Sequence, residues 1–249
     1  MKNLFTSISI LLVAALLPAT FAWAMGVAPV VIDMKSSGRS ARSEITASNT
    51  SASPLPIAIT VSEATISNTG EVTTVPVEDL FMIYPAQAII GAGGVQRFRV
   101  QWIGDPDLQR GRTFIFSVAQ QPVALPQGTS GIQILYNFET VVSVSPSAAQ
   151  PSLAITSSNF QTIEGKRRAA LTLNNPSAAV AYLSGSRVTL ESKDTGGRTV
   201  WTKTYEPNEI MQNVCVGIVG AGLSRQFVLP FDLPEGGTTL NARIRYIGR

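Results

Sequence analysis

Short apolar runs divided by turn-forming residues are the feature of this chain that most restricts its fold. The runs are rich in Val, Ile, Thr and aromatic residues, and clusters of Gly, Pro, Asn and Ser separate them. Helical periodicity is almost absent, so long amphipathic helices are not expected. The pattern is typical of antiparallel β-sandwiches and predicts an all-β fold.

The runs fall into two series, and each series is long enough for one immunoglobulin-like sandwich. The first predicts strands at 27–34, 43–48, 55–63, 80–84, 95–102, 113–119 and 132–144. The second predicts strands at 152–156, 168–173, 181–191, 198–204, 224–229 and 239–246. Small residues and two prolines at 145–151 suit neither sheet and indicate a boundary. We therefore expect an N-terminal domain at 25–146 and a C-terminal domain at 152–249.

Residues 1–24 have the features of a secretory signal peptide. Lys2 provides a positive start, the apolar run from Ile8 to Leu17 is too short to span a bilayer, and Ala22-Trp23-Ala24 fits a cleavage site. No later stretch reaches the length of a transmembrane helix. We expect cleavage before Met25 and a soluble, exported mature protein.

The residue content argues against catalysis and against metal binding. The chain has no histidine, which removes Ser-His-Asp and Cys-His catalysis and most zinc sites. No cluster of carboxylates and no Ser-Lys pair suggests another reaction. The only cysteine, Cys215, excludes an intramolecular disulfide, and we interpret it as a small buried side chain. We expect a protein that is not an enzyme and holds neither metal nor cofactor.

Two further features speak against nucleotide and nucleic-acid partners. The net charge is only +3, and no block of lysines and arginines is present that could follow a phosphate backbone. The glycine-rich stretch 91–94 lacks the ending of a phosphate-binding loop and precedes a predicted strand, so it is interpreted as a turn. The glycines at 217–222 lack a strand–helix–strand context, so no cofactor is expected there either.

The run from Gly131 to Pro146 is unusually long for a strand. Its apolar residues alternate, whereas strands average roughly 5–6 residues. A single sandwich core could cover only part of such a face, and an uncovered apolar strand favours aggregation unless a partner protects it. Two interpretations follow: an ordinary central strand that faces its own core throughout, or a strand whose first half is offered to another protein.

Several segments resemble, in order and spacing, those of periplasmic pilus-assembly chaperones. The most extensive is Tyr84-Pro-Ala-Gln-Ala-Ile-Ile-Gly-Ala-Gly-Gly-Val-Gln-Arg-Phe-Arg-Val100, in which a Pro-x-Gln stretch and a glycine turn lead into a strand that carries an arginine, here Arg99. The others are Val27-Ala-Pro29, Ala47-Ser-Asn49, Thr113-Phe-Ile-Phe116 and the long final strand of the first domain. The resemblance extends over nearly the whole mature chain.

The resemblance implies a boomerang of two Ig-like domains that acts in the periplasm. Chaperones of this family bind pilus or fimbrial subunits by donating a β-strand to an incomplete sandwich, and they deliver the subunits to an outer-membrane usher. By position, the donated side chains would be Ile132, Ile134 and Tyr136, with Phe138 extending the row. Two exposed strands of this kind would cover each other if two copies met, so the free protein is also a candidate for a homodimer.

The chain departs from the family pattern where the C-terminus of the bound pilus protein is usually anchored. Many members place an arginine and a lysine at positions that correspond here to Val31 and Val141, and an arginine before the hinge proline corresponds to Ser145. These differences suggest the archaic branch of the family. Arg97 and Arg99 share one face of a predicted strand, and we take them as candidates for the carboxylate anchor.

The main alternative is a two-domain β-sandwich that is itself a pilus or surface component. Such a protein should have an alternating extension before its first strand, whereas this chain enters strand pattern at Val27, soon after the expected cleavage site. A carbohydrate-binding or esterase-like exported protein is a third possibility. It would call for clustered aromatic residues or a histidine-bearing triad, but Trp102 and Trp201 are isolated in the sequence.

Overall fold

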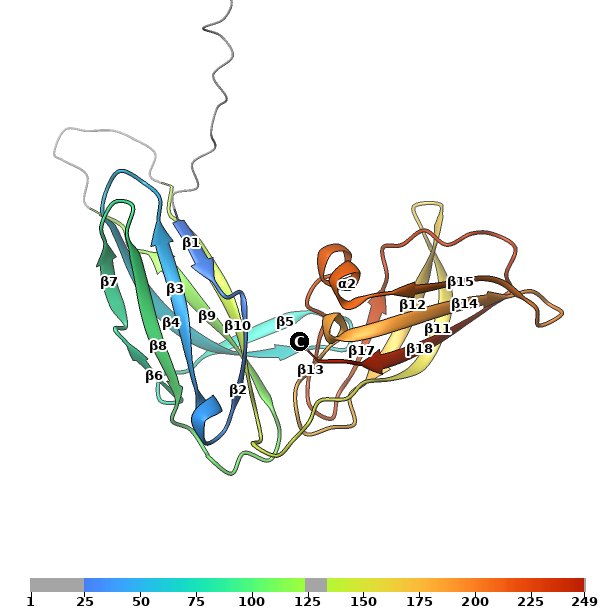
Figure 1. Ribbon diagram of the computed structural model, residues 1–249, viewed down its shortest axis with the longest axis horizontal. Coiled ribbons are helices and arrows are strands. Elements are labelled where there is room, and N and C mark those ends of the chain that lie inside the picture. The colour runs from blue at the N-terminus through green and yellow to red at the C-terminus, as the bar shows by residue number, and fades with distance from the viewer. Residues whose placement is uncertain (1–24, 124–133, 249) are drawn as a thin grey trace, which may run out of the picture.

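A computed structural model describes residues 25–123 and 134–248 of the chain (Figure 1). The predicted signal peptide and Ile132 lie outside the described residues. The described part is built almost entirely of β-strands that form two sandwiches, which meet at an angle (Figure 1). Among the described residues, no helix is long and apolar enough to cross a membrane. The predicted all-β class and the two-sandwich architecture are confirmed.

The first domain consists of two packed sheets. Its strands are β1 (Met25–Ala28), β2 (Val31–Lys35), β3 (Arg42–Asn49), β4 (Leu55–Ile66), β5 (Val72–Pro76), β6 (Phe81–Tyr84), β7 (Gln87–Ile90), β8 (Val95–Trp102), β9 (Arg112–Gln120) and β10 (Asn137–Ser145). One sheet has the order β1-β3-β8-β6, and the other has the order β2-β10-β9-β4-β5, with β7 also paired to β4.

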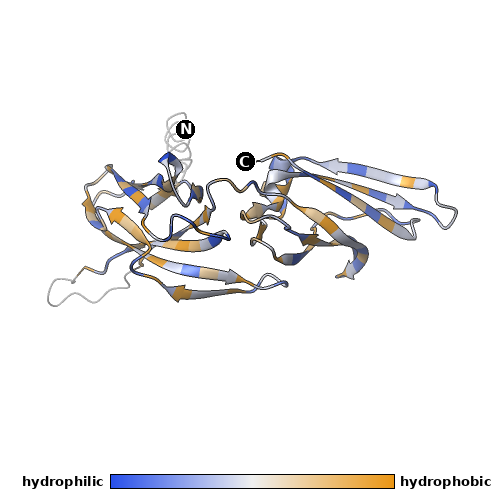
Figure 2. Ribbon diagram, turned by 90° about the horizontal axis from the view of Figure 1, so that it is seen from below, coloured by the Kyte–Doolittle hydropathy of each residue, from blue (hydrophilic) through white to orange (hydrophobic). Residues whose placement is uncertain are grey.

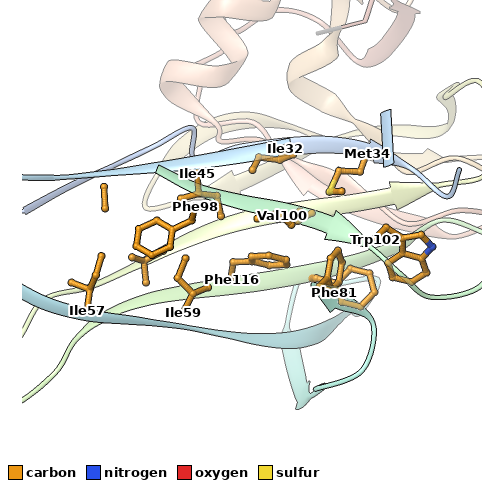
Figure 3. Packing of buried hydrophobic residues seen from close by; sticks show 14 of the residues in the cluster. Ile32, Met34, Ile45, Ile57, Ile59, Phe81, Phe98, Val100, Trp102 and Phe116 are labelled. Atoms are coloured by element: carbon orange, nitrogen blue, oxygen red, sulfur yellow. The ribbon is translucent and has the colours of Figure 1, made fainter. Parts of the chain in front are cut away.

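Alternating side chains from both sheets fill the core of the first domain (Figure 3). Toward one end of this core, Phe81 makes edge-to-face contacts with Trp102, Phe114 and Phe116, with ring centroids 4.8–5.1 Å apart. Burial of large aromatic side chains in such geometry contributes strongly to stability. The core explains why a chain without disulfides can hold this sandwich together.

The second domain is a smaller sandwich. Its strands are β11 (Ala154–Ile163), β12 (Lys166–Asn174), β13 (Ala181–Tyr182), β14 (Ser186–Lys193), β15 (Thr199–Tyr205), β16 (Ile218–Val219), β17 (Ser224–Val228) and β18 (Thr239–Tyr246). They form the sheets β11-β12-β17 and β15-β14-β18 and the short pair β13-β16. Both domains show the alternation of apolar and polar residues along their strands (Figure 2).

The structure corrects several sequence predictions. The strand expected at 27–34 is divided at Pro29: β1 pairs with β3, whereas β2 crosses to the other sheet and pairs with β10. A short helix, α2 (Pro207–Asn213), was not expected, although Pro207 at its first turn and the reciprocal cap between Glu206 and Glu209 were legible in the sequence. Cys215 is exposed, so its interpretation as a buried side chain was wrong.

Candidate protein-binding site

Among the described residues, no strand pairs with one side of the first half of β10, and we call this side the open edge. Residues 137–144 pair antiparallel with β9, but the parallel pairing with β2 begins only at Val141. The Gln120 amide donates to the Tyr136 carbonyl (2.8 Å), and the Val141 amide donates to the Val30 carbonyl (2.9 Å). Backbone groups alternate in direction along a strand, so those of Leu135, Asn137 and Glu139 point to the open edge.

The side chains of Ile134, Tyr136, Phe138, Thr140 and Val142 lie on one side of β10 and of the residues just before it, and we call them the inner row. Their exposure increases toward the N-terminal end. Val142 and Thr140 are fully buried, Phe138 is half-buried against the core, Tyr136 is 37% exposed and Ile134 is 69% exposed. The domain core thus covers the second half of the row and leaves the first half uncovered. In the structure the strand itself begins at Asn137, later than the predicted residue 132. The described residues just before it, 134–136, are not assigned to a strand.

The open edge ends where the two domains meet. Val31 and Val141 are partners in the β2–β10 pairing, and both pack into a separate apolar cluster with Val180, Tyr182 and Ile218 of the second domain. The Tyr182 hydroxyl is hydrogen-bonded to Ser143 Oγ (2.7 Å) and to Asp33. We call this group of contacts the interdomain junction.

Two hydrogen bonds bring the domains close together beside the junction. The Gly111 amide donates to the Ala178 carbonyl (2.8 Å), and the Val180 amide donates to Ser145 Oγ (3.1 Å). Ser145 is buried at this contact. The residue that stands in place of the family's arginine therefore bonds directly to the second domain.

Comparison with known proteins finds similarity in structure but not in sequence. No family model and no curated protein matches the sequence. A chain from a chaperone–tip adhesin complex of CFA/I fimbriae matches with a TM-score of 0.53 and 14% identity, over 90% of this chain and 98% of that one. The class 5 fimbriae chaperone CfaA matches with a TM-score of 0.54 and 14% identity, over 89% of this chain and 98% of CfaA.

A chain from the complex of the Salmonella enterica pilin SafA with the chaperone SafB matches with a TM-score of 0.51 and 13% identity, over 85% of this chain and 86% of that one. This protein has the fold of the fimbrial chaperones. The fold places β10 as the last strand of the first domain, next to the interdomain junction. Assignment to the archaic branch stays a prediction.

The candidate anchor residues Arg97 and Arg99 lie on β8 of this chaperone-like fold, in the four-stranded sheet. The junction is built from β2 and β10 in the other sheet. Arg97 Nε is 3.4 Å from Glu44 Oε1, and Arg99 lies beside Met82 and Tyr84 on an exposed surface. The structure does not bring either arginine to the junction, and their role as an anchor stays untested.

Two other basic side chains near the domain contact are already engaged. Arg112 donates to both carboxylate oxygens of Glu63 (2.7 Å and 2.5 Å), and this bidentate bond raises the pKa of the Arg112 guanidinium. Lys35 Nζ donates to the carbonyls of Ala149 (2.6 Å) and Pro146 (3.4 Å) in the linker. These cations hold the protein's own groups, and Arg225 of the second domain likewise donates from Nη1 to the carbonyl of the junction residue Ile218 (2.9 Å). The side chains of the Val31–Val141 pair are apolar.

Proposed function

We propose that this protein is a periplasmic chaperone that binds pilus or fimbrial subunits by donating strand β10 to their incomplete sandwich. The observation that carries the proposal is the inner row of β10, whose exposure rises from buried Val142 to exposed Ile134 beside an open backbone edge. Apolar side chains on an unpaired edge are otherwise a liability for a protein of this kind. The fold shared with fimbrial chaperones supports the same role.

The open edge and the inner row would contribute differently to binding. Backbone groups of Leu135, Asn137 and Glu139 would hydrogen-bond a strand of the pilus protein whatever its sequence, while Ile134 and Tyr136 would enter apolar pockets that fix its register. Phe138 is already half-buried against the chaperone core, so it would link the two cores. Ile132 would extend the row by one step.

Binding would help the pilus protein to fold without any nucleotide. A partner that binds the native-like state but not the unfolded one shifts the folding equilibrium by mass action. Release would follow at an outer-membrane usher, where the N-terminal extension of the next subunit replaces β10. The free chaperone could protect the same edge by pairing with a second copy.

Co-expression with a fimbrial subunit tests the proposal. Ile134→Asp and Tyr136→Asp place a charge in the row that would enter the pilus protein, and we expect each to abolish its recovery in soluble form from the periplasm. Because both side chains are exposed in the free chain, the variants should fold normally.

Ile89→Asp is the matched control, because Ile89 is 75% exposed but lies on β7, away from β10. This variant should deliver the fimbrial protein at the wild-type level. Normal recovery with both β10 variants would refute strand donation.

A further inference from the structure

The outer face of the six-stranded sheet carries few charged side chains. We define this face as the residues of four strands that alternate with the core positions: Val31, Asp33 and Lys35 of β2; Asn137, Glu139, Val141, Ser143 and Ser145 of β10; Thr113, Ile115, Ser117 and Ala119 of β9; and Ala58, Thr60, Ser62, Ala64 and Ile66 of β4. Only three of these side chains are charged. Two are acidic and one is basic.

Two of the three charges serve the contact between the domains. Asp33 is hydrogen-bonded to Tyr182, and Lys35 lies at the far end of β2, where it donates to the Ala149 carbonyl (2.6 Å). Glu139 is the third. It is exposed, it lies opposite Ser117 of β9, and no ion-pair partner is present for it among residues 25–123 and 134–248. The one charge beside the open edge is therefore negative.

The junction at the end of this edge is also unsuited to an anion. Val141 and the exposed Val30 offer no hydrogen-bonding side chain. Two acidic residues lie close to the Val31–Val141 pair in the sequence: Asp33 follows Val31 by two residues, and Glu139 precedes Val141 by two residues. A carboxylate placed here would meet two like charges. The nearest cation on this face, Lys35, is already bonded to the linker.

We propose that the strand added to the open edge of β10 carries a lysine or arginine facing Glu139, and that no C-terminal carboxylate is held at the Val31–Val141 pair. This inference rests on the proposed function and names the partner's chemistry. Opposite charges on directly facing residues of neighbouring strands attract, whereas like charges repel. The chaperone would thus prefer pilus proteins with a basic residue near this end of the groove.

Binding of synthetic peptides tests the inference with the mature chain as the receptor. The probes are three alternating Val/Thr peptides that differ only in a central Lys, Gln or Glu, each made with a free C-terminal carboxylate and with a C-terminal amide. Their affinities are measured by fluorescence anisotropy for the wild type, for Glu139→Gln and Glu139→Lys, and for the control Glu78→Gln. Glu78 is exposed and lies outside the strands.

We expect the Lys peptide to bind the wild type about two- to fivefold more tightly than the Gln peptide, with the Glu peptide weakest. Glu139→Gln should remove this order, Glu139→Lys should reverse it, and Glu78→Gln should preserve it. High salt should reduce the differences. The amide should bind at least as tightly as the free acid.

Two failures are distinguishable. Equal affinity for all three peptides, or tighter binding of the free acid, would overturn this inference while strand addition stands. If no peptide binds, or if Ile134→Asp leaves peptide binding unchanged, the proposed function itself is refuted.

Discussion

Val31 and Val141 face each other across the parallel pairing of β2 and β10, and both pack against the second domain. The positions where the resemblance implies a pair of basic residues are thus adjacent in space but form an apolar contact. Val31 is only 8% exposed in this contact. The pair contributes to the cohesion of the two domains and offers no charge to a ligand.

A charge at Val31 should therefore destabilise the protein. We expect Val31→Arg to lower the free energy of unfolding by about 3 kcal/mol, because a guanidinium would be buried without an adequate partner. Val141→Lys should cost about 1 kcal/mol, since Val141 is partly exposed and a lysine can extend its ammonium group to water. Urea unfolding followed by fluorescence measures both changes.

Val75→Lys serves as the control for these variants, because Val75 is 66% exposed on β5 and should tolerate the charge within about 0.5 kcal/mol. Wild-type stability of Val31→Arg would show that the junction can accept a cation, contrary to this description.

The close approach of the two domains at Gly111 leads to a second prediction. A Cβ atom there would lie 2.9 Å from the Val180 amide nitrogen and 3.1 Å from Ser145 Oγ. Gly111→Ala should separate these groups, lower stability by about 1–2 kcal/mol and expose the linker to protease. The rate of limited proteolysis within residues 145–151 reports the loosening.

Gly91→Ala provides the comparison, since a Cβ atom at Gly91 meets nothing within 4 Å. It should leave the cleavage rate unchanged. Equal rates for both alanine variants would mean that Gly111 does not control the contact between the domains.

Tyr205 should make the second domain sensitive to alkaline pH. Burial of its ring, together with the negative charge of Glu209, raises the pKa of Tyr205 to about 12. An unfolded tyrosine ionises near pH ~10. As the pH rises from about 10 to about 12, the unfolded state loses this proton first, so the stability that depends on neutral Tyr205 is lost in that interval.

Comparison of the wild type with Tyr205→Phe isolates this contribution from the other groups that titrate there. The phenylalanine variant should lose less stability than the wild type between pH ~10 and ~12 in urea unfolding. Parallel stability curves for the two proteins would contradict the assignment.

The period-2 pattern of β10 carried much of what could be predicted about the site. The pattern indicated a face too long for one core, and the resemblance placed Ile134 and Tyr136 on the half offered to a partner. In the structure these two side chains are exposed, while Val142 and Val144 are buried in the core. The pattern did not reveal that the regular ladder begins only at Asn137. That boundary depends on where β9 ends, at Gln120, which is a property of the pairing between strands.

Other features depended on tertiary contacts that local patterns do not record. At Pro29 the chain crosses from one sheet to the other, so that β2 lies beside β10. In the sequence, the only trace of this crossing is the proline within the apolar run predicted as a single strand at 27–34. Arg97 and Arg99 share a face as expected, but the sheet that contains β8 is not the one that meets the second domain. A sequence pattern can predict which residues share one face of a strand, but it cannot predict which part of the protein that face contacts.

The most direct test of strand donation is residue-resolved amide hydrogen exchange of β10, with and without a bound fimbrial protein. In the free protein, the amides of Phe138 and Thr140 face β9 and should exchange slowly, while those of Asn137 and Glu139 face the open edge and should exchange quickly. We predict that binding of the fimbrial protein protects the amides of Asn137 and Glu139. A stable complex in which both amides still exchange at the free-protein rate would contradict the account.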